Sequence, residues 1–155
     1  MVQPHQEVAL VTRPLSLTAA TYSSPVCSPG QVIVFDIVFL ISLINWVGAK
    51  QTCEDLHGHL VKIETEEENE ELYNEAVRLN MTSESWIGLS DAAEEGNWVW
   101  TSGERAKFTK WSTAEPNNSQ GKENCAVLYT FVVSHGKWND VPCQSQRGAI
   151  CELIM

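Results

Sequence analysis

The chain has 155 residues, which is enough for one domain with a sizeable core and too few for two ordinary domains. Hydrophobic residues make up 43% of it, and its formal net charge is −10. A protein this acidic offers no basic face to a phosphate backbone, so we expect no nucleic-acid partner. Many of the glutamates fall within residues 64–75, a run that indicates a solvated helix face.

The N-terminal part shows no regular pattern. Residues 1–26 are rich in Pro, Ser and Thr, and we expect a poorly ordered tail there, followed by one domain over residues 27–155. The apolar stretch 32–44 contains Asp36 and is shorter than the roughly 20 residues of a membrane span, so we expect no membrane insertion. Its β-branched and aromatic residues favour a strand or strand pair, with a signal or anchor segment as the alternative.

Two helices are expected next. Asn45 is a suitable N-cap for a helix that runs from Trp46 to about Leu56, with Gly58 as its stop. Residues 60–63 then favour a short strand.

The second helix begins with a capping box. Thr65 is followed three residues later by Glu68, and the helix is expected to end near Leu79. Leu72, Ala76 and Leu79 supply its inward stripe.

After residue 85 the sequence pattern changes to short apolar runs separated by Gly, Asn, Pro and Ser. Residues 86–89, 98–100, 125–133 and 149–153 are all typical of strands. A long polar segment, 108–122, has neither helical nor strand periodicity, and loops of that length are commonly functional. Two helices followed by several short strands predict an α+β domain.

Oxygen-bearing side chains are grouped near two of the cysteines. The group comprises three carboxylates and two carboxamides: Glu115, Asn117, Glu123, Asn139 and Asp140. Hard oxygen donors without a soft ligand suit Ca²⁺, which takes about six to eight oxygens. The same residues are also compatible with an ordinary polar loop.

Five cysteines stand at positions 27, 53, 125, 143 and 151 without a CxxC pair. Their wide spacing favours long-range disulfides formed in an oxidising compartment, which indicates a secreted protein. Spacing alone leaves three pairings open for any four of them, and the fifth must be free or paired outside the chain.

Several of these motifs occur together in one order. They are Trp46, Ala49 and Cys53; Trp86-Ile87-Gly88-Leu89; Glu115-Pro116-Asn117; Glu123-Asn124-Cys125; Trp138-Asn139-Asp140 before Cys143; and Cys151-Glu152. With this set, the chain from residue 46 to 152 resembles the C-type lectin-like domain. The resemblance implies that fold: two helices, short antiparallel strands and a long calcium-binding loop.

The resemblance also implies specific pairings and roles. It implies the disulfides Cys53–Cys151 and Cys125–Cys143 and a cis peptide bond before Pro116. It places a principal Ca²⁺ site on the five oxygen-bearing residues named above. It further implies that Glu115, Asn117, Glu123 and Asn139 bind sugar hydroxyls beside the ion.

The resemblance also implies a class of sugar ligand and a second calcium ion. The order Glu-Pro-Asn resembles the version associated with mannose, N-acetylglucosamine and fucose, so the expected partners are glycans with such terminal sugars on microbial or cell surfaces. Asp91 and Glu95 match two ligands of an auxiliary calcium site. Asn118 and Asn124 stand where the family often has aspartates, so we expect calcium to bind more weakly there. Cys27 lacks the partner found in longer family forms, and Val38 stands near that place.

Three function classes were compared. A glycosidase would use Glu115 and Glu123 as its acid pair, but a cation stabilises the ionised forms of both, so we expect a binding protein and no enzyme. A mineral- or protein-binding member of the same fold is the alternative to a lectin. A weak monosaccharide site also favours clustering through a homo-oligomer.

Two Asn-X-Ser/Thr glycosylation sequences are present. One is Asn80-Met81-Thr82, which we expect to be exposed, and the other is Asn117-Asn118-Ser119. A glycan on Asn117 would destroy the expected metal site.

Overall fold

The computed structural model describes residues 8–9, 35–81 and 83–154. Its elements are, in chain order, β1 Val8–Ala9, β2 Phe35–Ile44, α1 Trp46–Asp55, β3 Gly58–Leu60, α2 Glu66–Arg78, β4 Glu84–Ser90, β5 Val99–Trp100, a 3₁₀ turn Ser119–Gly121, β6 Cys125–Tyr129, β7 Trp138–Val141 and β8 Arg147–Ile154. No helix among these residues is long and apolar enough to cross a bilayer.

One sheet organises the domain in the order β1-β2-β8-β4-β6-β7, with β3 paired to β8 and β5 to β4. Adjacent strands are antiparallel except β4 and β8, which run parallel, so the sheet is mixed where the sequence predicted antiparallel strands alone. Phe35 at the start of β2 lies opposite Ile154 at the end of β8, so the described domain begins and ends side by side.

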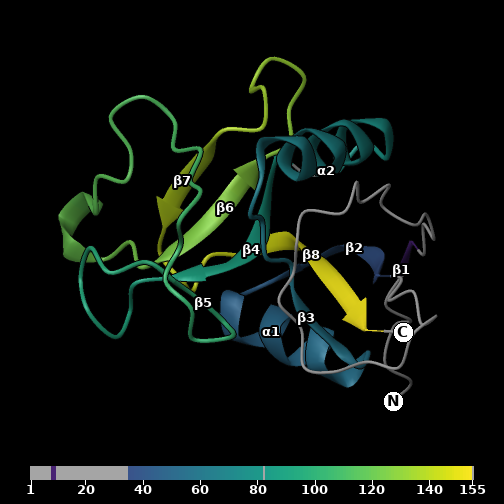
Figure 1. Cartoon of the computed structure of the whole chain (residues 1–155), viewed down its shortest axis with the longest axis horizontal. Helices are drawn as coiled ribbons and strands as arrows, with labels where there is room; N and C mark the ends of the chain where they lie inside the picture. Colours follow the sequence, from purple (N-terminus) through teal and green to yellow (C-terminus); the bar gives the residue numbers. More distant parts are fainter. Residues whose placement is uncertain (1–7, 10–34, 82, 155) are drawn as a thin grey trace, which may run out of the picture.

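Each helix covers one face of the sheet (Figure 1). Along β2, Ile37 and Phe39 belong to the core cluster that contains Leu72 of α2. Val38 and Leu40 alternate with them and belong to the cluster that contains α1. Because both faces are covered, the central strands are buried on both sides, as near-continuous apolar runs predict.

The first helix confirms its predicted start. Asn45 accepts a hydrogen bond from Gly48 N at 2.8 Å and so caps α1. The indole of Trp46 donates to Ile87 O of β4 at 3.0 Å, which fixes the helix entry against the sheet.

The predicted helix stop was wrong in detail. His57, with φ of 65°, adopts the left-handed conformation, and Gly58 already belongs to β3. A Cβ on Gly58 would lie 2.2 Å from the backbone oxygen of Glu152, so this glycine is needed for close strand approach. The strand predicted at 60–63 is shorter and earlier than expected, and covers Gly58–Leu60.

The capping box of α2 is confirmed. The Thr65 hydroxyl accepts from Glu68 N at 3.1 Å, and the Glu68 carboxylate accepts from Thr65 N at 3.3 Å. Leu72 and Ala76 are buried, and Leu79 packs partly buried at the helix end.

The region after β6 differs from the prediction. β6 ends at Tyr129, and the apolar residues that follow form a turn instead of continuing the strand. Val132 and Val133 in this turn are 71% and 75% exposed. The Tyr73 hydroxyl of α2 donates to Val132 O, so the turn backbone is attached to the helix.

The N-terminal segment is described only at Val8–Ala9, which pair with β2. These two residues therefore form a strand inside the tail that was predicted to be poorly ordered. Cys27 and the remaining residues before 35 lie outside the described residues.

The structure contains both implied disulfides, Cys53–Cys151 and Cys125–Cys143. The first joins α1 to β8 and spans 98 residues of sequence. The second spans 18 residues and joins the start of β6 to the segment after β7.

Candidate functional site

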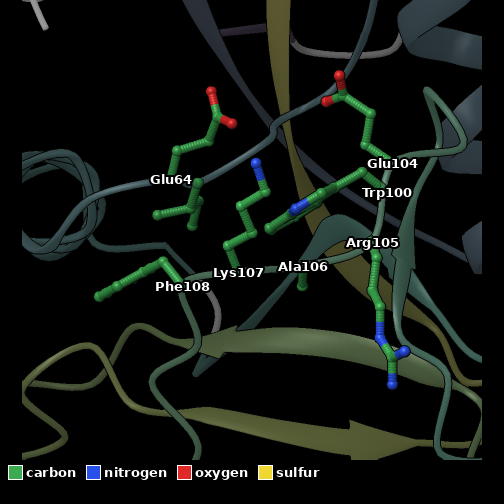
Figure 2. Close-up of a pocket in the computed structure, with 8 residues that line it drawn as sticks. Glu64, Trp100, Glu104, Arg105, Ala106, Lys107 and Phe108 are labelled. Carbon is green, nitrogen blue, oxygen red and sulfur yellow. The ribbon is translucent and has the colours of Figure 1, made fainter.

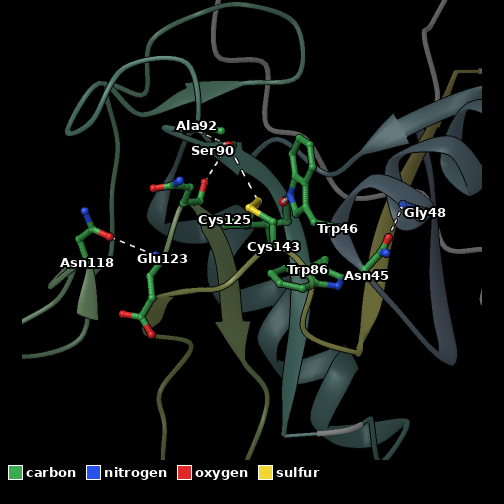
Figure 3. Close-up of a disulfide and its surroundings, with 12 residues drawn as sticks. Asn45, Trp46, Gly48, Trp86, Ser90, Ala92, Asn118, Glu123, Cys125 and Cys143 are labelled. Atoms are coloured by element: carbon green, nitrogen blue, oxygen red, sulfur yellow. Dashed lines mark hydrogen bonds between the residues drawn. A yellow bond between two sulfur atoms is a disulfide. The ribbon is translucent and has the colours of Figure 1, made fainter. Parts of the chain in front are cut away.

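The predicted ligands on β7 are positioned by a short β-hairpin. In the β6–β7 ladder, Ala126 lies opposite Asp140 and Val127 lies opposite Asn139. Glu123 precedes β6 by two residues. The Cys125–Cys143 disulfide closes the same end of the hairpin, where Ser90 Oγ donates to Asn124 O at 2.7 Å (Figure 3).

The Glu-Pro-Asn part of the long loop is attached to this hairpin through the Asp140 carboxylate. Asp140 is fully buried, and its Oδ1 and Oδ2 accept from Asn117 N at 3.1 Å and Asn118 N at 2.6 Å. The peptide bond between Glu115 and Pro116 is cis, as the resemblance implies. A buried aspartate thus holds the Glu-Pro-Asn segment over the end of β7.

The second half of the loop closes on itself. Asn118 adopts the left-handed conformation with φ of 44°, and its Oδ1 accepts from Glu123 N at 3.0 Å (Figure 3). The Glu123 carboxylate accepts from Ser119 N at 2.8 Å. Glu123 is therefore engaged by the loop backbone.

Two carboxyl groups meet at the centre of the site. Burial raises the pKa of Glu115, and the adjoining Asp140 carboxyl raises that pKa further. One Glu115 oxygen accepts from the side-chain amide of Asn117 at 2.9 Å. The other, Oε2, is buried and has no hydrogen-bond partner among the described residues, and the same holds for Oδ1 of Asn139.

These observations test whether the donor set fits a cation. Buried oxygens without partners cost free energy, and adjoining carboxylates repel each other, unless a positive group lies between them. Glu115 and Asn139 supply orphaned oxygens, and Asp140 supplies the adjoining charge. The residues present fit Ca²⁺, whose ligands are carboxylate and amide oxygens.

The structure brings together only some of the five predicted calcium ligands. Glu115, Asn117 and Asp140 are joined by hydrogen bonds, whereas Glu123 is directed at Ser119 N. Within the described ranges, no three Asp, Glu, His or Cys side chains form a ready cluster for a metal ion. The loop therefore brings together part of the predicted set.

The two residues of the expected auxiliary calcium site, Asp91 and Glu95, differ in their exposure to solvent. Asp91 is 2% exposed; its Oδ2 accepts from Gly96 N at 2.9 Å, and its Oδ1 has no hydrogen-bond partner in the part of the chain that the structure describes. Burial raises the pKa of Asp91. Glu95 is exposed to solvent.

Asn69 is a supporting residue that the sequence interpretation missed. It is fully buried on α2, its amide donates to Gly136 O at 2.9 Å, and its carbonyl accepts from Trp138 Nε1 at 2.7 Å. Trp138 directly precedes the two β7 residues of the site. Asn69 shares the helix face of Leu72 and Ala76, so its position on the inward stripe was the available signal.

The tryptophans of this region pack in or against the core. Trp138 is fully buried, and Trp98 and Trp100 are 8% and 3% exposed. Trp111 packs against Trp98 and Trp138, with ring centroids 4.8 Å and 5.8 Å apart. Trp111 thus anchors the beginning of the long loop.

A separate pocket lies outside the predicted ligand set. It has a volume of about 480 Å³, and its lining includes Ile63, Trp100 and Phe108 (Figure 2). Lys62 forms ion pairs with Glu64 and Glu104 at its rim.

The sequence comparison decides the family. Residues 42–153, well over half of the chain, match the model of the lectin C-type domain. The chain belongs to this family. Its curated relatives and solved neighbours include lectins and receptors.

Two curated relatives illustrate the proteins to which the chain is similar. The chain is 40% identical over 98 residues to the alpha-N-acetylgalactosamine-specific lectin of Patiria pectinifera, covering 62% of this chain and 58% of that one. It is 36% identical over 116 residues to hepatic lectin of Gallus gallus, covering 74% of this chain and 52% of the relative. The matched region thus spans little more than half the length of these relatives.

A solved structure supports the fold. The mouse scavenger receptor C-type lectin carbohydrate-recognition domain superposes with a TM-score of 0.70 at 30% identity. The match covers 83% of this chain and 96% of that domain.

Proposed function

We propose that the protein is a secreted, calcium-dependent lectin that binds terminal mannose-type sugars at the junction of the long loop and β7. The observation that supports this most directly is the pair of buried, unpartnered oxygens on Glu115 and Asn139 beside the Asp140 carboxylate. Glycans with terminal mannose, N-acetylglucosamine or fucose on microbial or cell surfaces are the proposed partners.

The site would hold one Ca²⁺ through Glu115, Asn117, Glu123, Asn139 and Asp140. When bound, the ion supplies open coordination positions that two neighbouring sugar hydroxyls occupy. Carboxylate oxygens of Glu115 and Glu123 accept from those hydroxyls, and the amides of Asn117 and Asn139 donate to them. For Glu123 to take part, its carboxylate must leave Ser119 N.

The sugar preference rests on the Glu-Pro-Asn order and on the donor arrangement. Glu115 accepts and Asn117 donates in the present geometry, since the Asn117 amide already points at the Glu115 oxygen. A cow CD23 carbohydrate-recognition domain, 29% identical with a TM-score of 0.66, was solved in the presence of a GlcNAc2Man3 oligosaccharide. The Patiria relative is named for N-acetylgalactosamine, so this sugar is the informative comparison.

One site of this kind binds a monosaccharide weakly, at roughly millimolar Kd or about −4 kcal/mol. Binding to a glycan-covered surface then depends on several sites acting together. We therefore propose a homo-oligomer as the working form, to be checked by light scattering of the secreted protein.

The alternative is a protein-binding domain of the same fold that uses no sugar. Its support is that the Asp140 and Glu123 carboxylates already accept backbone hydrogen bonds and so serve to shape the loop. This alternative predicts a folded protein that binds no glycan with or without calcium.

The deciding experiment is a glycan array with Ca²⁺ and with EDTA, followed by elution from mannose-agarose. We expect calcium-dependent retention, elution by free mannose and little elution by N-acetylgalactosamine. The double variant Glu115→Gln with Asn117→Asp should shift elution towards galactose-type sugars. Glu104→Gln, a carboxylate change in the separate pocket, is the matched control and should bind as wild type.

Retention that survives EDTA would contradict the calcium mechanism. Calcium-dependent binding that prefers N-acetylgalactosamine would contradict the mannose assignment alone. The absence of any glycan binding, with a folded protein, would favour the protein-binding alternative.

A further inference from the structure

We propose that Asn80 carries an N-linked glycan and that the second acceptor sequence, at Asn117, stays unmodified. Both asparagines begin an Asn-X-Ser/Thr sequence. Their structural surroundings differ, and that difference carries the inference.

Asn80 stands at an exposed corner. It follows the last turn of α2 with φ of 52°, a left-handed conformation that asparagine adopts more readily than most residues. Its backbone N–H donates to Val77 O at 3.0 Å, and the next residue, Met81, is 7% exposed and donates to Ala76 O. The backbone on both sides of the acceptor amide is therefore anchored.

The side-chain amide of Asn80 projects from this anchored corner into solvent. No hydrogen bond within the described part of the chain engages it. A bulky, hydrated glycan there displaces no contact of the fold.

Asn117 is also exposed, but its side chain is engaged by hydrogen bonding. Its side-chain amide donates to Glu115 Oε1 at 2.9 Å, and its backbone N–H donates to Asp140 Oδ1. A sugar on that amide nitrogen would stand directly between the loop and the carboxylates of the site. A glycan on this nitrogen would disturb the hydrogen bond to Glu115, so we expect Asn117 to stay unmodified.

The two ends of α2 separate Asn80 from the proposed sugar site. Glu66, at the N-terminal end, pairs with Lys110 of the long loop. Asn80 follows the other end of this 13-residue helix, about 20 Å further along its axis at 1.5 Å per residue. Figure 1 shows α2 on the side of the domain away from the 3₁₀ turn of the long loop, so we expect a glycan beyond the helix end to leave this part of the loop open.

The modification is a glycosyl transfer from a lipid-pyrophosphate-linked oligosaccharide. A bond forms between the Asn80 side-chain nitrogen and the anomeric carbon of the donor sugar, while the bond from that carbon to the pyrophosphate oxygen breaks. The amide nitrogen loses one proton, and the lipid pyrophosphate leaves. No oxidation or reduction is involved.

The test uses the full chain secreted from a eukaryotic host behind a secretory leader. Intact mass is measured before and after peptide-N-glycosidase treatment in ¹⁸O water, which marks the released asparagine as an ¹⁸O-labelled aspartate. We expect the mass to fall by one glycan, with the label at position 80. Asn80→Gln should lose this mass change completely, and Ser119→Ala should retain it.

Thr82→Ala is the second variant, because it removes the acceptor sequence while Asn80 keeps its left-handed position. It should also be secreted without the glycan. A secreted wild-type protein with no mass change would overturn the inference, and so would a label at position 117. These readouts are independent of sugar binding, so their failure is distinct from failure of the lectin proposal.

Discussion

Trp138 Nε1 donates a 2.7 Å hydrogen bond to Asn69 Oδ1, and this buried contact joins α2 to the strand that carries Asn139 and Asp140. The same asparagine donates to Gly136 O at the entrance of that strand. One polar residue inside an acidic helix therefore helps to hold the site strand, which is also paired with β6.

We expect Asn69→Ala to lower the free energy of unfolding by about 2–6 kcal/mol, because it leaves two buried polar groups unsatisfied at about 1–3 kcal/mol each. Urea unfolding followed by tryptophan fluorescence measures the change. Asn74→Ala, at an exposed position of the same helix, is the control and should fall within about 0.5 kcal/mol of wild type. Equal effects at the two positions would contradict the role of Asn69.

Calcium should stabilise the protein through the adjoining Glu115 and Asp140 carboxyls. Ligand at about 100 times its Kd adds about 2.7 kcal/mol, so Tm should rise when Ca²⁺ replaces EDTA. Glu115→Gln should lose most of this rise, and in EDTA its Tm should equal or exceed that of wild type, because the contact between like charges is gone.

Differential scanning fluorimetry checks both parts, with Glu67→Gln on the exposed surface of α2 as the control. A calcium-induced rise of wild-type size in Glu115→Gln would mean that the ion, if bound, uses another set of residues.

The two disulfides should differ in their contributions to stability. Cross-links that close longer loops restrict the unfolded chain more, so replacing Cys53 and Cys151 together by Ala should cost about 4–5 kcal/mol. The matching replacement of Cys125 and Cys143, which are 18 residues apart, should cost about 3 kcal/mol. Equilibrium unfolding in urea measures both, and the reverse order would indicate native-state contacts that outweigh loop entropy.

Glu152 makes stability depend on pH in an unusual direction. Burial raises the pKa of its carboxyl above the ordinary 4.5, and His59, 3.9 Å away, opposes that shift. A raised folded-state pKa means that the folded protein binds more protons than the unfolded chain. The contribution of Glu152 to stability is therefore full below pH 4.5 and falls as the pH rises towards the folded-state pKa.

As the pH rises above 4.5, the variant Glu152→Gln should become more stable relative to wild type. Below pH 4.5, the difference in unfolding free energy between the two proteins should not change with pH. Chemical unfolding at a series of pH values checks this, with Glu71→Gln, an exposed residue, as the control. A constant difference between Glu152→Gln and wild type at all pH values would rule out the titration of Glu152 as its cause.

Local signals in the sequence were sufficient for the starts of the two helices. The cap at Asn45 and the capping box of Thr65 and Glu68 involve residues within one turn, so their outcome depends little on the rest of the fold. Strand ends depend on distant partners. Val132 and Val133 have strand-forming side chains, yet they lie in a turn whose backbone accepts a hydrogen bond from Tyr73 of α2.

The sequence predicted which residues would form the proposed site, but it predicted their spatial arrangement only in part. The sequence identified Glu115, Asn117 and Asp140, which the structure joins by hydrogen bonds. It did not indicate that Glu123 would face Ser119 N, because that contact arises from the left-handed bend at Asn118. Asn69 was missed because a buried asparagine among glutamates is indistinguishable by composition from a solvated one.

The pairing of Phe35 with Ile154 has an architectural consequence. A polypeptide that enters and leaves a domain at one place can be spliced into, or fused to, another protein without spanning the fold. Figure 1 shows the C-terminal end of β8 on the side away from the long loop. A protein fused at this end would therefore lie on the opposite side of the domain from the proposed sugar-binding loop and would leave that loop accessible.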